Sequence, residues 1–180
     1  MDSADARATF GTVMQRLGAW KHWRGLRDAG LVLLVFVAIR AYQRRDMPHG
    51  PAPALSGTDL AGQSVSLESY RGKPMVLYFW ATWCGVCRAE QHNIEAVARS
   101  EPVLTVASES GSASDVAAVV RERGITPRVI VDDGATLARR FGVHAFPSTF
   151  VIDGDGTIRH VEVGYTSELG LRARVWLAGW

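Results

Sequence analysis

The segment that decides the fold reads Met75-Val76-Leu77-Tyr78-Phe79-Trp80-Ala81-Thr82-Trp83-Cys84-Gly85-Val86-Cys87. It opens with an uninterrupted apolar run over residues 75–80, which is typical of a buried strand. A helix-forming stretch follows the second cysteine and continues to Ala98. The first cysteine therefore lies where a strand passes into a helix, near the positive end of the helix dipole. That position lowers the pKa of a thiol and favours the reactive thiolate.

Cys84 and Cys87 are the only two cysteines of the chain. The second lies one helical turn after the first, close enough to resolve a mixed disulfide. A structural disulfide and half of a zinc site are the alternatives, but no second cysteine pair exists to complete a zinc site. The strand-to-helix context favours redox chemistry, so we predict Cys84 as the nucleophile and Cys87 as the resolving thiol of a redox-active disulfide.

Charge is distributed unevenly along the 180 residues. Residues 1–45 hold eight Arg and Lys and three Asp, whereas residues 46–180 hold twelve basic and fifteen acidic residues. A basic head beside an apolar stretch indicates a membrane rather than a nucleic acid. The mildly acidic body shows no basic and aromatic patch suited to nucleic acid, so we expect no nucleic-acid partner.

An uncharged, mostly apolar run covers residues 29–39. As a helix, it would reach roughly 16 Å, short of a hydrocarbon core of about 30 Å. Aromatic residues flank the run, and flanking arginines can extend their charged ends to the interface, which lengthens the usable helix to residues 23–42. A cleaved signal peptide is the alternative, but Ala52-Pro53-Ala54 lies far beyond the apolar run for a cleavage site.

These features divide the chain into four parts. We expect a cytoplasmic N-terminal segment at 1–22, a single transmembrane anchor at 23–42, a Pro-rich linker at 43–54 and one folded domain at 55–180. The larger number of basic residues before the anchor favours an inner-membrane orientation with the domain in the periplasm.

Strand-like and helix-like segments alternate through the domain. The pattern predicts an α/β sandwich with a mixed sheet that ends in a hairpin around residues 153–156 and a terminal helix. The expected strands are 64–67, 75–80, 103–107, 128–131, 148–152 and 157–163, and the expected helices are 84–100, 113–123, 135–141 and 167–180. Ser112 or Ser114 is the expected N-cap of the second helix.

Residues 79–90, Phe-Trp-Ala-Thr-Trp-Cys-Gly-Val-Cys-Arg-Ala-Glu, resemble the active site of membrane-anchored, thioredoxin-like disulfide oxidoreductases. The chain is most similar to the TlpA-like family, which includes cytochrome c maturation thiol reductases. Within that family it resembles ScsD-type (suppressor of copper sensitivity) proteins. Residues 67–75 and 146–153 add two further motifs in the family's order. The resemblance covers about residues 55–180. It implies a thioredoxin-like fold, a mixed central sheet flanked by helices, with an extra βα unit before the second of these motifs.

The resemblance also implies roles for individual residues. Pro147 is the expected cis-proline, and the backbone of Phe146 would pair with substrate in a strand-like way. Trp83 would shield the thiol and contact the partner polypeptide. Glu90 would accept the proton of Cys87 during exchange, the alternative being a solvated helix acid. Tyr78 stands where thioredoxin itself carries a buried proton-accepting Asp.

The resulting hypothesis is a membrane-tethered periplasmic thiol–disulfide oxidoreductase that needs no cofactor. Its partners would be exported proteins with cysteines and a membrane electron carrier that re-reduces it, in a cytochrome c maturation or copper-tolerance type of role. The rival hypothesis is a copper-binding or metallochaperone module. In that case Cys84 and Cys87 would hold Cu(I), because soft thiolates favour that ion. A separate hypothesis adds His144 as a third ligand, the alternative being an ordinary loop histidine.

Overall fold

The computed structural model describes residues 27–39, 41–43 and 45–180. The chain divides into two compact units, Met1–Tyr42 and Gln43–Trp180, and each is considered by itself. The predicted cytoplasmic segment 1–22 and the first residues of the predicted anchor lie outside the described residues.

The first unit is helical over residues 27–39, and residues 41–43 are also helical. Its apolar side chains are exposed on consecutive residues from Leu31 to Val37, and consecutive residues on a helix point in all directions. Across residues 27–39, 41–43 and 45–180, no helix combines the length and the apolar character needed to cross a membrane.

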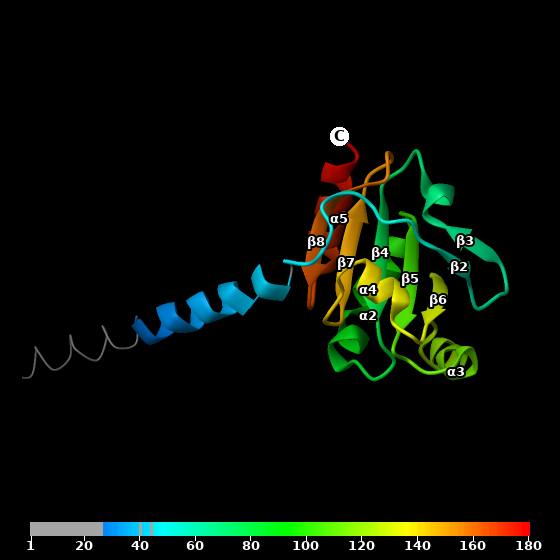
Figure 1. Cartoon of the computed structure of the whole chain (residues 1–180), viewed down its shortest axis with the longest axis horizontal. Coiled ribbons are helices and arrows are strands. Elements are labelled where there is room, and N and C mark those ends of the chain that lie inside the picture. The colour runs from blue at the N-terminus through cyan, green and yellow to red at the C-terminus, as the bar shows by residue number, and fades with distance from the viewer. Residues whose placement is uncertain (1–26, 40, 44) are drawn as a thin grey trace, which may run out of the picture. The chain divides into compact units, whose positions relative to one another are not determined.

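A six-stranded mixed sheet forms the centre of the second unit, with the strand order β1-β8-β7-β4-β5-β6 (Figure 1). Strands β4, β5 and β6 run parallel, whereas β7 is antiparallel to β4, and β8 and β1 continue the antiparallel side. The strands are β1 (Gly50–Pro51), β4 (Met75–Trp80), β5 (Val103–Ser108), β6 (Arg128–Asp132), β7 (Ser148–Ile152) and β8 (Thr157–Val163). The predicted mixed sheet is confirmed.

Helices cover both faces of the sheet, which explains why all six residues of β4 are buried. Alternate residues of a strand point to opposite faces. Tyr78 and Trp80 pack with residues of α2 (Gly85–Ala98) and α5 (Glu168–Ala178). Leu77 and Phe79 instead pack with residues of α4 (Thr136–Arg140), which lies in front of the strands in Figure 1.

Between α2 and β7 the chain forms β5, α3 (Ala113–Arg123), β6 and α4, and so contains the βα unit expected there. Helix α3 has the predicted bounds, and Ser112 is its N-cap. The Ser112 side chain accepts a hydrogen bond from the Asp115 N–H, while the Asp115 carboxylate accepts one from the Ser112 N–H. This reciprocal capping box satisfies backbone donors that the helix itself cannot bond.

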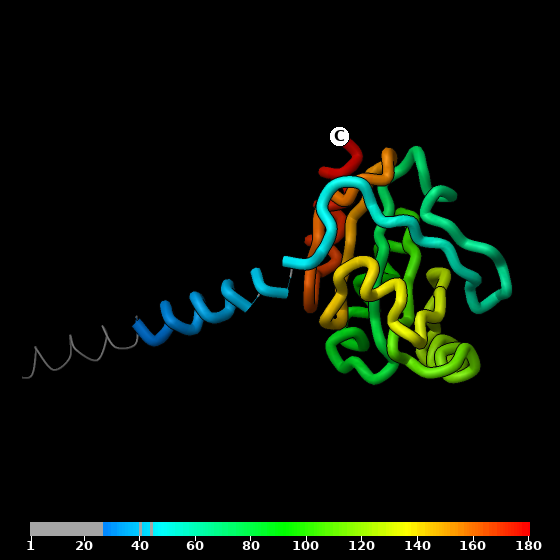
Figure 2. The backbone as a smooth tube through the Cα atoms, viewed as in Figure 1, coloured from blue at the N-terminus to red at the C-terminus, as the bar shows by residue number. Residues whose placement is uncertain are grey.

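The segment expected to be a Pro-rich linker is packed onto the folded domain. Met47 is only 3% exposed and belongs to the hydrophobic core. Gly50 and Pro51 form β1, and the Ala52 N–H donates to the Gly156 carbonyl at 2.9 Å. Figure 2 shows this segment in cyan, passing across the domain toward β2 (Ser56–Thr58). Residues 46–54 are therefore part of the domain rather than a free spacer, because their apolar and backbone groups have partners in the core and the sheet.

The chain then forms a small two-stranded sheet from β2 and β3 (Ser64–Ser66), followed by a short 3₁₀ helix at Leu67–Tyr70. Asp59, between the two strands, makes a bridge to Ile130 of β6 and an ion pair with Arg128 at 2.8 Å. This hairpin closes the β6 side of the domain, away from β8.

Candidate active site

The two cysteines lie where β4 leads into α2. Cys84 is the N-cap residue of α2, and its Sγ accepts a hydrogen bond from the Cys87 N–H at 3.0 Å. The two form a disulfide with their Cα atoms 5.2 Å apart. Cys84 is 6% exposed and Cys87 4%. The Cys84 sulfur therefore occupies the positive end of the helix, where a thiolate would be stabilised after reduction.

The loop before Cys84 is held by residues that follow β5. The Thr82 N–H donates to the Ser110 Oγ at 3.0 Å, and the Ser110 hydroxyl donates to the Ser108 carbonyl at 2.8 Å. The Arg123 guanidinium, at the end of α3, donates to the Thr82 carbonyl at 2.9 Å. The end of β5 with its following loop and the end of α3 thus fix the backbone that presents Cys84.

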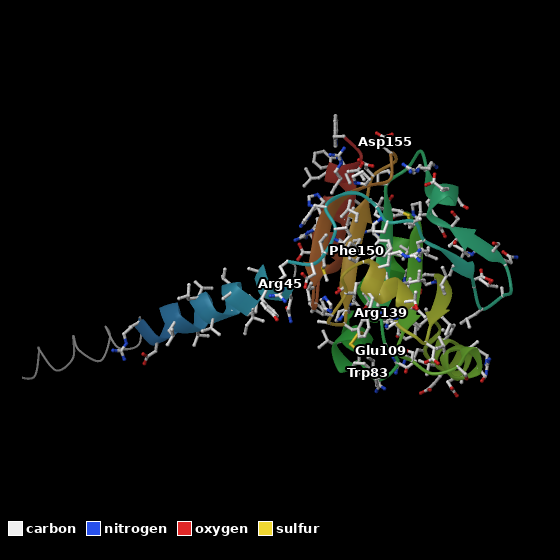
Figure 3. All side chains as sticks on the ribbon, in the orientation of Figure 1. Arg45, Trp83, Glu109, Arg139, Phe150 and Asp155 are labelled. Atoms are coloured by element: carbon white, nitrogen blue, oxygen red, sulfur yellow. A yellow bond between two sulfur atoms is a disulfide. The ribbon has the colours of Figure 1, made fainter. Side chains whose placement is uncertain are left out.

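Trp83 stands beside the disulfide with 65% of its surface exposed. Its indole N–H donates to the Glu109 carbonyl at 2.9 Å, and its ring meets that of Phe146 edge to face with centroids 5.9 Å apart. Figure 3 shows Trp83 and Glu109 together at one end of the domain and Asp155 at the opposite end. The structure therefore brings together two of the three residues predicted to bind substrate.

The third such residue, Pro147, follows a cis peptide bond from Phe146, so the predicted cis-proline geometry is confirmed. The antiparallel pairing of Phe79 with Ser148 places this proline beside the end of β4, where the cysteine loop begins. The Pro147 carbonyl accepts a hydrogen bond from the Gly164 N–H at 2.8 Å. The roles of Trp83, Phe146 and Pro147 in substrate binding remain predictions.

Glu90 lies one helical turn after Cys87 and is completely buried. Its Oε1 accepts the Thr166 N–H at 2.8 Å, and its Oε2 accepts the Tyr78 hydroxyl at 3.2 Å. Burial raises the pKa of Glu90 to about 7, against the opposing effect of these two hydrogen bonds. A solvated helix acid is therefore excluded, and a carboxyl group that titrates near neutral pH is suited to proton transfer.

The sequence did not predict that Tyr165 and Thr166, in the loop before α5, would contact Glu90 and its neighbour Asn93 on α2. Asn93, one turn after Glu90, is buried and donates to the Thr166 carbonyl at 2.9 Å and to the Tyr165 hydroxyl at 3.0 Å. These bonds tie the loop before α5 to α2. Ser167 gives a recognisable N-cap signal for α5, but no local pattern shows that the preceding residue faces Glu90.

His144 does not join the cysteines. Its imidazole Nε2 lies 3.4 Å from the Asp46 carboxylate. In the described part of the chain, no three side chains among His, Cys, Asp and Glu are grouped so that they could hold a metal ion. Among the described residues, His144 is therefore not placed as a third ligand for Cu(I) beside the two cysteines.

Comparison with known proteins places this site in a family. The AhpC/TSA family model matches residues 48–161. The chain belongs to the AhpC/TSA family. A thioredoxin-like protein of Haemophilus influenzae is 32% identical over 150 residues, which are 82% of this chain and 89% of that protein. A thiol-disulfide oxidoreductase ResA of Bacillus anthracis is 29% identical over 117 residues, which are 63% of this chain and 68% of that protein.

Solved structures of similar fold are thiol–disulfide proteins. A thioredoxin-family thiol:disulfide interchange protein from Chlorobium tepidum is similar with a TM-score of 0.63 at 29% identity, covering 73% of this chain and 97% of that one. DsbF of Mycobacterium tuberculosis is similar with a TM-score of 0.62 at 27% identity, covering 69% of this chain and 95% of that one. The chain is a thioredoxin-like thiol–disulfide oxidoreductase with a Cys84–Cys87 pair in a Cys-x-x-Cys motif, which confirms the predicted thioredoxin-like α/β fold of the domain and the predicted enzyme class.

Proposed function

We propose that this enzyme is tethered to the bacterial inner membrane and exchanges disulfides with exported proteins in the periplasm. The role would be that of a TlpA-like, ScsD-type protein in cytochrome c maturation or copper tolerance. The observation that carries the proposal is the Cys84–Cys87 disulfide at the start of α2, with a buried carboxylate one turn further on. Exported proteins are the clients that carry disulfides.

In the reducing direction, the Cys84 thiolate attacks one sulfur of a client disulfide. The client S–S bond breaks, a mixed disulfide forms at Cys84, and the first client thiolate leaves. The Cys87 thiol gives its proton to the Glu90 carboxylate, and the resulting thiolate attacks the Cys84 sulfur. The Cys84–Cys87 disulfide closes, the second client thiolate leaves, and the two client thiolates take up protons from Glu90 and from water.

Two electrons pass to the client in each turnover, so the enzyme must regain two electrons from a dithiol. We propose that a membrane electron carrier supplies them, because a cytoplasmic thioredoxin cannot reach an exported domain.

Run in reverse, the same steps would oxidise a client dithiol. The surroundings of the disulfide suit either direction, since Trp83 and Phe146 offer apolar contacts to a client chain beside the Cys84 sulfur.

The exposed apolar helix of the first unit supports the tether. Its side chains from Leu31 to Val37 have no polar face among them, and a helix that is apolar all round requires an apolar environment. Carbonate washing of membranes that contain the full-length chain tests this part. We expect the chain to stay in the membrane pellet and a variant without residues 1–42 to appear in the supernatant after the wash. A full-length chain released by the wash would contradict the tether.

Trapping of mixed disulfides tests the exchange itself. In a Cys87→Ala variant, Cys84 can attack a client but nothing resolves the adduct. We expect this variant to accumulate adducts with exported proteins that a thiol reductant dissociates, and a Cys84→Ser variant to accumulate none. Equal trapping by the two variants would overturn the assignment of Cys84 as the nucleophile. The identity of the trapped proteins decides between cytochrome c maturation and copper tolerance.

A further inference from the structure

Tyr78 is a polar residue in the middle of an otherwise apolar strand. Its side chain points to the same face of β4 as Trp80, into the layer beneath α2, and is almost completely buried. Its hydroxyl donates to the Oε2 of Glu90 at 3.2 Å. A buried tyrosine usually finds a hydrogen-bond partner, but here the partner is the carboxylate proposed to take the proton of Cys87.

Glu90 receives one donor on each oxygen, and the two donors differ in kind. The Thr166 N–H belongs to the backbone of the loop before α5, so it depends on the path of the chain. The Tyr78 hydroxyl belongs to a side chain and depends on the residue type at position 78. Replacing that one residue would change the electrostatics of Glu90 without rerouting the backbone.

We propose that Tyr78 is a positioning residue whose hydroxyl orients the Glu90 carboxylate and favours its charged form, and thereby sets the pH at which Cys87 can resolve a mixed disulfide. This inference rests on the proposed proton transfer from Cys87 to Glu90. Only a charged Glu90 can accept that proton, and a hydrogen bond donated to a carboxylate stabilises the charged form.

The effects of burial and of neighbouring charges on the pKa values of Glu90 and Tyr78 agree with this role for Tyr78. Burial raises the pKa of Glu90, and the hydrogen bonds from Thr166 and Tyr78 limit the rise. Burial and the adjacent Glu90 charge also raise the pKa of Tyr78, so its hydroxyl keeps its proton and remains a donor throughout the working range. The other titratable or charged groups on α2, on α5 and on the loop before α5 are Cys87, Arg88, His92, Glu95, Tyr165 and the ion pairs Arg172–Glu168 and Arg174–Glu162, and Arg123 lines a cavity together with Tyr78 and Glu95.

Tyr78→Phe removes the hydroxyl and keeps the ring that fills the core. The reduced full-length chain would be mixed with oxidised glutathione from pH 5 to 9, with rapid acid quenching. Mass spectrometry then separates the glutathione adduct at Cys84 from the closed disulfide. We expect the midpoint of the resolution rate to move by about one pH unit toward alkaline pH, with a roughly tenfold slower rate below the midpoint. An unchanged midpoint would overturn the role of Tyr78.

Three further variants make the outcome specific. Tyr70→Phe removes a hydroxyl from the 3₁₀ helix outside the site and should keep the original midpoint. Fluorotyrosine at position 78 is a stronger donor of the same shape, so it should move the midpoint toward acid pH, and it serves if Tyr78→Phe does not fold. Glu90→Gln should abolish the transition, and Tyr78→Phe should then add no shift.

The pattern of results separates the two proposals. If Glu90→Gln abolishes the transition while Tyr78→Phe and fluorotyrosine leave the midpoint unchanged, Tyr78 has no positioning role and the Glu90 proton transfer stands. If Glu90→Gln leaves the whole profile unchanged, the proton transfer to Glu90 is wrong, and the role of Tyr78 is wrong with it.

Discussion

Glu90 is subject to two opposing effects at the scale of a single residue. Its burial in the core disfavours a charged carboxylate, whereas the N–H of Thr166 and the hydroxyl of Tyr78 favour it. The balance leaves the pKa at about 7, against an ordinary value of 4.5. The folded protein therefore binds this proton more tightly than the unfolded chain does, and this difference ties stability to pH.

The stabilising contribution of protonated Glu90 should be fully present below pH 4.5 and lost as the pH rises through about 7. A Glu90→Gln variant stays neutral, so it should gain stability relative to the parent chain over that range, by about 3 kcal/mol if the whole shift is expressed. Urea unfolding of the oxidised chains at several pH values measures the difference. The exposed acid Glu122 gives the control, because Glu122→Gln should change little with pH. Parallel curves for the parent and Glu90→Gln would contradict the expected linkage.

The residue scale also shows what sequence can predict about a site. Cys84 and Cys87 lie in a short motif, so their pairing could be predicted from neighbouring residues, whereas the cis geometry at Pro147 was implied only by the family resemblance. The partners of Glu90 could not, because Thr166 is 76 residues away along the chain and contributes only a backbone N–H. A backbone donor leaves no signature in the residue type, and it is found only once the fold has brought the two segments together.

Gly142 allows a second prediction at this scale. It has a φ of 63°, and a Cβ there would collide with the Asp46 carbonyl. Gly124 has the same φ of 63° with open space around the Cβ position. Gly124→Ala should therefore lower the free energy of unfolding by only about 1–2 kcal/mol, the strain of a left-handed backbone with a Cβ, and Gly142→Ala should lower it clearly more. Equal losses in urea unfolding would show that the contact with Asp46 does not hold the N-terminal segment in place.

Helix ends provide the prediction that belongs to the scale of elements. Ser112 bonds reciprocally with Asp115 at the start of α3, whereas Ser114 was the other N-cap candidate. Ser112→Ala should lower the free energy of unfolding by about 1 kcal/mol, because backbone donors of the first turn lose their acceptor. Ser114→Ala is the matched control and should cost less. Thermal unfolding measures both losses. A larger loss of stability for Ser114→Ala than for Ser112→Ala would show that Ser114, and not Ser112, is the N-cap.

Most elements could be predicted because their signals are local. Strands β4, β7 and β8 and helix α3 have the expected bounds, and each has a clear apolar run or a capping signal. Strand β1 could not be predicted, since Gly50 and Pro51 have low strand propensity and gain their conformation by pairing with β8, more than a hundred residues later. Its Pro-rich composition indicated a linker, and long-range packing overrode that local preference.

At the scale of the whole molecule, the packed N-terminal segment moves the boundary of the domain. A chain of residues 43–180 keeps Met47 in the core and β1 in the sheet, whereas a chain of residues 55–180 lacks both. The shorter chain should be less stable by at least about 2 kcal/mol, the lower end of the cost of losing a buried methionine side chain. Thermal unfolding of the two oxidised chains measures this. Equal melting temperatures would restore the interpretation of residues 43–54 as a free linker.

The way in which Trp83 is fixed has a practical consequence for observing the enzyme. A disulfide quenches the fluorescence of a neighbouring indole, and Trp83 is adjacent to Cys84 in the chain. Because the Glu109 carbonyl holds the indole in one orientation, the distance between fluorophore and quencher is well defined. We therefore expect the emission of Trp83 to rise when the Cys84–Cys87 disulfide is reduced, and a Trp83→Phe variant identifies its share among the six tryptophans of the chain.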